Sequence, residues 1–214
     1  MKNSSLLISA VILLGIISLS GCGRAESKVY KQYYDVVTGA DTKKWDGFAL
    51  VDLDGDGVSE LFATCINGER EDESIQPYMI VGYKDNAAVL NEELQDGVAG
   101  AGGYRGTLYY IGGKGLLHES MTIAPFGLPA DTVYKLRDGT VEISDTGEFS
   151  IDSYGDPEDE DWDPLQNGTW TWNGETVTEE QYNDMLNKAL SGEEGLPMSS
   201  IEWKSRDDIL KELK

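Results

Sequence analysis

The residues with the clearest chemical potential lie in one short segment, residues 48–61, which reads FALVDLDGDGVSEL. Counting from Asp52, carboxylates stand at positions one, three, five and nine, and glycines stand at positions four and six. Alternate side chains of a tightly curled loop converge, and carboxylates crowded together repel one another unless a cation lies between them. Hard oxygen ligands in a flexible loop suit Ca²⁺ better than Mg²⁺, which requires a tighter octahedron. The segment therefore predicts a calcium site, and an acidic hairpin without metal is the alternative.

The same segment resembles the calcium loop of FG-GAP and VCBS-type extracellular repeats, in which the loop joins two antiparallel strands. The resemblance implies a structural calcium ion with five ligands, namely the side chains of Asp52, Asp54, Asp56 and Glu60 and the carbonyl oxygen of Val58. A complete EF-hand would need Glu at position twelve, where this chain has Ala63, and would need helical flanks. The loop occurs once, which is too few copies for a propeller.

A second motif lies at the N-terminus. Lys2 precedes an apolar run over residues 6–19, which is short for a membrane span of about 20 residues but typical of a secretory signal. The run ends in Leu-Ser-Gly-Cys at residues 19–22, which resembles the lipobox of bacterial lipoproteins. The resemblance implies that residues 1–21 are removed and that Cys22 carries fatty acyl chains such as palmitate. An ordinary signal peptide that ends near a cysteine is the alternative.

These two motifs together resemble small surface lipoproteins of anaerobic Gram-positive bacteria that carry a single calcium loop and have no assigned activity. The resemblance implies an acidic protein on the extracytoplasmic face of the cell membrane, held there by its lipid. Two or three acyl chains, each worth about 0.8 kcal/mol per buried methylene, make such an attachment effectively permanent.

The overall charge limits the partners. The 214 residues carry a formal charge of −22, from 17 Lys and Arg against 39 Asp and Glu. Such a surface repels phosphate backbones, which argues against nucleic acid as a partner. One His and two Cys are too few for a zinc site built from several of them. Cys65 lies in an apolar run and is expected in the core, and His118 is expected as a strand residue rather than a base.

Two further features have open interpretations. The acidic stretch at residues 156–163 forms either a second cation site or a solvated loop. Trp170 and Trp172 share one face of a strand, so they either stack on a sugar ring or pack within the protein.

The elements that position these residues predict a mainly β (α+β) fold, an antiparallel meander or small sandwich. Eight runs of period-two character cover residues 48–51, 61–66, 78–83, 87–90, 107–111, 116–123, 132–136 and 140–151. Tight hairpin turns are expected at residues 85–86, 112–113 and 138–139, and a last hairpin at 168–178 turns at 173–174.

Helices are expected at both ends of the domain. Residues 22–27 form a polar tether, and apolar residues at helical spacing predict a short helix over 28–38. A capping box at Thr178 opens a helical appendage that runs to about residue 190, and a second helix covers 205–213. Residues 28–214 thus form a single domain.

We therefore expect a lipid-anchored, extracytoplasmic calcium-binding module with a binding or scaffold role, whose partner is a glycan or a cell-surface protein. A carboxylate-based glycan hydrolase and an accessory lipoprotein of a transporter are the alternatives. A catalytic role is the less expected one, because none of the common hydrolase or nucleotide-binding motifs occurs.

Overall fold

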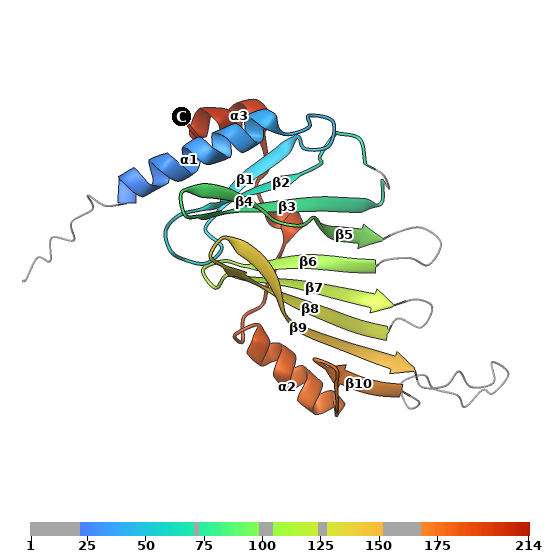
Figure 1. Cartoon of the computed structure of the whole chain (residues 1–214). Coiled ribbons are helices and arrows are strands. Elements are labelled where there is room, and N and C mark those ends of the chain that lie inside the picture. Colours follow the sequence, from blue (N-terminus) through green and yellow to red (C-terminus); the bar gives the residue numbers. More distant parts are fainter. Residues whose placement is uncertain (1–21, 71–72, 99–104, 124–127, 152–167) are drawn as a thin grey trace, which may run out of the picture.

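One antiparallel sheet forms the body of the chain in the computed structural model (Figure 1). The structure describes residues 22–70, 73–98, 105–123, 128–151 and 168–214. The fold is mainly β with helices at the N-terminus and near the C-terminus, which confirms the predicted class. The signal segment at 1–21, most of the glycine-rich loop at 97–106 and the acidic stretch at 156–163 lie outside the described residues.

The strands follow one another across the sheet almost in chain order, which is the predicted meander. The strands described are β1 (Gly47–Val51), β2 (Glu60–Thr64), β3 (Ile75–Lys84), β4 (Ala87–Leu90), β5 (Leu94–Val98), β6 (Arg105–Ile111), β7 (Leu116–Ile123), β8 (Leu128–Arg137), β9 (Thr140–Ile151), β10 (Gly168–Trp172), β11 (Glu175–Val177), β12 (Leu196–Pro197) and β13 (Lys204–Ser205). Their order is β11-β10-β9-β8-β7-β6-β5-β3-β2-β1-β13, with β4 paired to β3 and β12 paired to β6.

The hairpin turns form where the sequence predicted them. Asp85 and Asn86, Asp138 and Gly139, and Asn173 and Gly174 all have positive φ, the conformation that two-residue hairpin turns require and that Asn, Asp and Gly tolerate best. The turn between β6 and β7 is longer than expected, and its positive φ angles fall on Gly113 and Gly115 rather than on the pair 112–113.

Three α-helices flank the sheet in the described chain: α1 (Cys22–Gly39), α2 (Glu179–Ala189) and α3 (Arg206–Glu212). A short 3₁₀ turn, η3 (Met198–Ser200), precedes α3. The N-terminal helix begins at Cys22 rather than at residue 28, so the stretch expected to be a tether is helical. The predicted capping box is present, because Thr178 and Gln181 each accept a backbone N–H of the other.

α1 and α3 lie together on one face of β1–β3 (Figure 1). Their apolar side chains and those of the strands form one core cluster of buried residues, whose largest members include Tyr33, Phe48, Leu61 and Ile209. The Arg206 guanidinium also donates to the carbonyl oxygens of Val37, Thr38 and Ala40. It thereby satisfies carbonyl groups that the C-terminus of α1 would otherwise leave unpaired.

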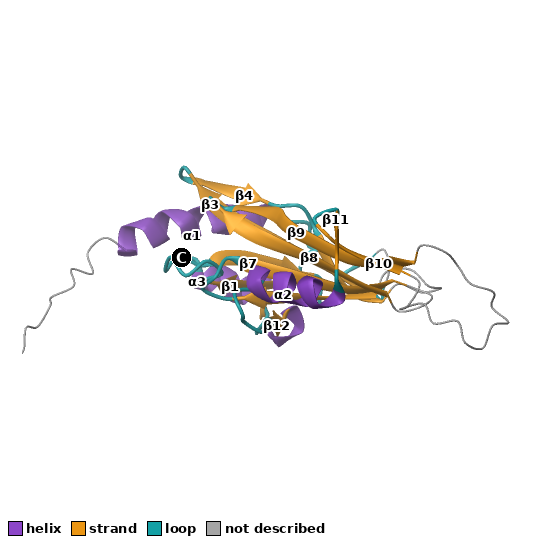
Figure 2. Ribbon diagram, turned by 90° about the horizontal axis from the view of Figure 1, so that it is seen from below, coloured by secondary structure: helices purple, strands orange, loops and turns teal. Residues whose placement is uncertain are grey.

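The sheet curls, so that the β8–β9 turn packs against β3 although the two are not neighbours in the strand order (Figure 2). Asn91 connects the two parts, because its amide donates to the carbonyl oxygens of Ile80 and Gly139 and its oxygen accepts the N–H of Val141. A Cβ on Gly82 of β3 would overlap the backbone of Gly139, so this close approach requires glycine. A second core cluster, which includes Phe62, Leu108 and Leu117, spans strands from both parts.

Among the described residues, one buried side-chain hydroxyl in the core has no hydrogen-bond partner. Tyr33 is fully buried, and its hydroxyl makes no hydrogen bond within the described chain. Burial, together with the nearby Glu60 and Asp56 carboxylates, raises the pKa of this phenol. The group is therefore a neutral hydroxyl that loses its hydrogen bonds to water on folding.

The substitution Tyr33→Phe is accordingly expected to leave the free energy of unfolding unchanged or to raise it by about 1 kcal/mol. It removes a hydroxyl that is desolvated on folding and breaks no hydrogen bond. Tyr182→Phe is the matched control, since the Tyr182 hydroxyl donates to the buried carboxylate of Asp131, and its removal should cost about 1–3 kcal/mol. Urea denaturation of both variants measures the difference, and equal losses would show that the Tyr33 hydroxyl has a partner.

Candidate metal site

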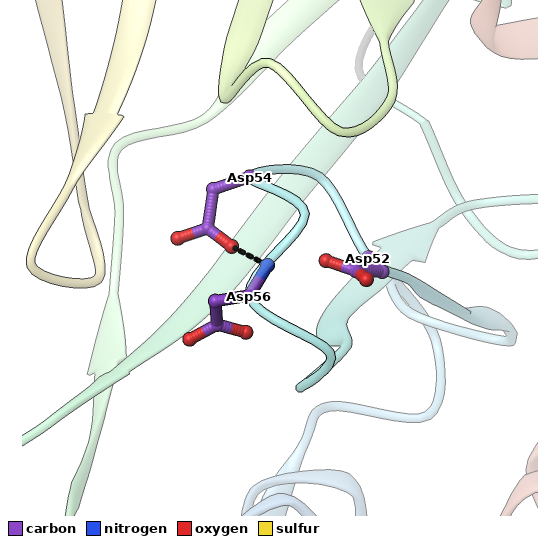
Figure 3. Close-up of side chains that lie close together, drawn as sticks. All are labelled: Asp52, Asp54 and Asp56. Atoms are coloured by element: carbon purple, nitrogen blue, oxygen red, sulfur yellow. Dashed lines mark hydrogen bonds between the residues drawn. The ribbon is translucent and has the colours of Figure 1, made fainter. Parts of the chain in front are cut away.

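The three aspartates of the predicted loop come together in the turn between β1 and β2. Asp52, Asp54 and Asp56 each offer a carboxylate oxygen, and these three atoms lie within 4.8 Å of one another. Figure 3 shows the carboxylates of Asp54 and Asp56 side by side, with that of Asp52 on the other arm of the loop. Asp54 and Asp56 are exposed and Asp52 is half-buried, so the group is accessible from solvent. This cluster could hold a metal ion.

Asp52 and two glycines produce the curl of the loop. The Asp52 carboxylate accepts the N–H of Gly55 at 2.8 Å and that of Gly57 at 3.2 Å. Gly55 has φ +79° and Gly57 has φ +85°, in the left-handed region that residues with a Cβ adopt at a cost. The glycines at positions four and six are therefore needed for the turn that makes the carboxylates converge.

The other two aspartates also hold the turn. Asp54 accepts the N–H of Asp56 at 3.1 Å, and Asp56 accepts the N–H of Val58 at 2.7 Å. Each bond engages one carboxylate oxygen and leaves capacity for a cation, because an ionised carboxylate has about four acceptor positions. That the carbonyl oxygen of Val58 is a calcium ligand stays a prediction.

Backbone hydrogen bonds from the turn between β6 and β7 hold the loop in place. Gly113 donates its N–H to the carbonyl oxygen of Asp52 at 3.3 Å, while Lys114 and Gly115 donate to that of Leu53 at 3.0 and 2.7 Å. The Leu53 side chain is fully buried in the core cluster that also holds Leu108 and Leu117. These contacts with the β6–β7 turn partly preorganise the loop for a ligand. They could not be predicted from the sequence, because they join distant segments.

Glu60, the fourth predicted side-chain ligand, lies outside the group of three aspartates. It is 5% exposed, and its carboxylate accepts the N–H of Leu53 at 2.9 Å. Burial raises the pKa of this carboxyl to about 7, and the negative charges of Asp54 and Asp56 act in the same direction. The pKa of Asp54, although its side chain is exposed, is raised as well, first by partial desolvation in the loop and then by the carboxylates of Asp56 and Asp52. A bound cation would relieve this repulsion.

The structure also answers the questions about isolated residues. Cys65 is fully buried, as predicted. Trp172 is buried, and the rings of Trp170 and Trp172 both contact that of Tyr182, at 4.7 and 5.5 Å between centroids. These contacts confirm the packing interpretation of the tryptophan pair.

The sequence analysis did not predict a polar cluster around His118. His118 lies in strand β7 as expected, but its Nε2 is 2.7 Å from Oδ1 of Asp131 in β8. Asp131 is 6% exposed, and its Oδ2 accepts the hydroxyl of Tyr182 from α2. The sequence did contain a signal for this cluster. Asp131 lies two residues before the buried Val133 on the same strand, so it faces the core, and a buried carboxylate needs hydrogen-bond partners.

Comparisons with models of protein families, with curated proteins and with solved structures found no match. What the fold and the site define is therefore a class: a mainly β, α+β protein with an aspartate-rich hairpin loop that could hold a metal ion.

Proposed function

We propose that this protein is a lipid-anchored calcium-binding module with a binding or scaffold role on the outer surface of the cell membrane, where its partner is a glycan or a protein. The observation that carries the proposal is the convergence of Asp52, Asp54 and Asp56 in a glycine-curled turn. Carboxylates in a solvent-accessible, adaptable loop favour Ca²⁺ over Mg²⁺, which retains its waters and needs a stricter geometry.

A structural role for the ion follows from where the loop lies. It joins β1 to β2, which pair from Gly47 with Thr64 to Val51 with Glu60. Phe48 on β1 is fully buried, and so are the β2 residues that follow Glu60. A cation that stabilises the turn therefore stabilises the hairpin that supplies much of the core.

The position of Cys22 in the fold supports the anchor. α1 begins at Cys22 and runs as one helix to Gly39, with its N-terminal end extending beyond the sheet (Figure 1), so a lipid on Cys22 would be joined to the folded domain through this helix. Among the described helices, none combines the length and the apolar character needed to cross a membrane. Attachment through acyl chains on Cys22 agrees with the lipobox-like sequence that ends there.

Calorimetric titration of the purified full chain with CaCl₂ tests the metal proposal. We expect one calcium ion per chain, with a dissociation constant on the order of 10⁻⁴ to 10⁻³ M, as in extracellular modules, and weaker binding of Mg²⁺. Asp54→Ala should abolish the binding isotherm. Asp35→Ala, which removes an exposed aspartate of α1, is the matched control and should leave it unchanged. Equal isotherms for the two variants would remove the proposed site.

The anchor has its own test. When the chain is produced in bacteria fed a radioactive fatty acid, the wild type should carry the label, because its Cys22 thiol is the acceptor. Cys22→Ala should be unlabelled and should accumulate at the larger size of the precursor. Cys65→Ala is the matched control and should keep the label, since Cys65 is buried in the core. Equal labelling of the wild type and Cys22→Ala would contradict the proposed anchor.

A further inference from the structure

A cleft of about 450 Å³ lies between the sheet and α2. Strands β6 and β7 provide one wall, α2 provides the other, and the segment between α2 and β12 closes one end. The lining includes Tyr109 and His118 from the sheet, Leu186 and Leu190 from the helix side, and Glu193 and Glu194 from the closing segment. None of these residues belongs to the metal loop, so the cleft is a separate site.

His118 is held rigidly at the sheet wall. Tyr109 pairs with His118 across β6 and β7, and Ser120 pairs with Asp131 across β7 and β8, which puts the four side chains on one face. The Tyr109 ring stacks on the imidazole, with centroids 5.8 Å apart. The Asp131 carboxylate accepts a hydrogen bond from His118 on one oxygen and from Tyr182 on the other. A side chain fixed in this way is preorganised for a ligand.

These bonds decide which hydrogen-bonding role His118 can offer to the cleft. An ionised carboxylate only accepts hydrogen bonds, so the Nε2 atom facing Asp131 carries the proton. In a neutral imidazole the second nitrogen, Nδ1, is then an acceptor. This atom makes no hydrogen bond within the described chain, so it is the ring nitrogen that remains for a ligand.

The charged groups of the cleft, like the acceptor nitrogen of His118, favour a ligand that donates hydrogen bonds. Glu193 and Glu194 contribute two exposed carboxylates, and the described lining residues include no lysine or arginine. Every charged group in the described lining would therefore repel an anion, whereas a group with several N–H donors and a positive charge meets His118 Nδ1 and two carboxylates. Leu186, Leu190 and the Tyr109 ring supply apolar contact for the frame that carries such a group.

We propose that this cleft binds a primary ammonium group on a small aliphatic or sugar frame, with His118 and the Glu193–Glu194 pair as its acceptors. A diamine and an amino sugar both present this chemistry. The site needs no metal, so the proposal stands or fails independently of the calcium loop.

The chain contains a single histidine, which makes its imidazole an unambiguous reporter. The purified full chain, labelled with ¹⁵N-histidine, is titrated with putrescine and with glucosamine, each in the presence of a chelator. We expect a saturable shift of the His118 Nδ1 resonance with at least one amine, because that nitrogen becomes a hydrogen-bond acceptor. Butane-1,4-diol and glucose have the same frames without the ammonium group and should give no saturable shift. The amine that binds identifies the source of the ammonium group.

Because the whole chain is acidic, general attraction of cations must be separated from binding in the cleft. The double variant Glu193→Gln, Glu194→Gln should weaken amine binding about tenfold or more, a loss of about 1.4 kcal/mol. The double variant Glu142→Gln, Glu202→Gln removes the same charge from exposed positions outside the cleft and should leave the affinity unchanged. The proposal is overturned if neither amine gives a saturable shift, or if both double variants weaken binding equally.

Discussion

Chelating divalent cations is expected to lower the melting temperature of this protein by several degrees, and added calcium is expected to restore it. Without a cation, the carboxylates of Asp52, Asp54 and Asp56 repel one another within 4.8 Å. The unfolded chain holds no preformed site, so the free energy of binding appears as stability of the folded state. At a calcium concentration one hundred times the dissociation constant this amounts to about 2.7 kcal/mol, or several degrees for a domain of this size.

The comparison between variants makes this expectation specific to the loop. Asp54→Ala should melt at the same temperature with chelator and with calcium, whereas Asp35→Ala should show the full difference of the wild type. Magnesium at equal concentration should restore less of the melting temperature than calcium does. If the wild type melts identically with chelator and with excess calcium at low ionic strength, the loop is an acidic hairpin without a metal function.

The parts of this structure that sequence predicted are those governed by local chemistry. The turns at Asp85–Asn86, Asp138–Gly139 and Asn173–Gly174 need positive φ, and few residue types supply it, so the residue types reveal the hairpins. The convergence of the three aspartates was predictable for the same reason, because Gly55 and Gly57 permit the curl wherever the loop lies in the fold.

Elements that depend on pairing with distant residues were missed. β5 (Leu94–Val98) has no alternation of apolar and polar residues and contains a glycine, yet it lies between β3 and β6 in the sheet. Its identity as a strand comes from two neighbours rather than from its own sequence. β12 and β13 have two residues each and likewise exist only through their partners β6 and β1.

The same limit applies to the polar cluster around His118. The partner carboxylate of Asp131 lies on the next strand, and the register that brings it close pairs His118 with Val133. Neither the register of β7 with β8 nor the position of Tyr182 on α2 can be deduced from one sequence. The contact of Glu60 was not foreseen either: its carboxylate accepts the N–H of Leu53, and its part as a calcium ligand stays a prediction.

Acidifying the metal-free protein from pH 7 to pH 5.5 is expected to raise its free energy of unfolding. Burial raises the pKa of Glu60 from 4.5 to about 7, and the charges of Asp54 and Asp56 add to the effect. Between these two values the folded state binds a proton that the unfolded chain does not, so stability falls as the pH rises towards 7. Because the carboxyl is already about half protonated at pH 7 in the folded state, its further protonation down to pH 5.5 corresponds to about 1–2 kcal/mol. Asp54, whose pKa is also raised, acts with the same sign.

The variant Glu60→Gln distinguishes titration of the Glu60 carboxyl from titration of the many other carboxylates in the chain. The amide oxygen of glutamine can still accept the Leu53 N–H that Glu60 accepts at 2.9 Å, but it does not titrate. Urea denaturation in the presence of a chelator should therefore show most of the pH dependence lost in Glu60→Gln and retained in Glu142→Gln, a change at an exposed position. Saturating calcium should flatten the wild-type dependence as well, because the cation favours the ionised carboxylates. An equal rise in stability on acidification for wild type and Glu60→Gln would mean that the carboxylate of Glu60 is not the titrating group. The effect would then come from partial neutralisation of the net charge of −22, which is spread over the whole chain.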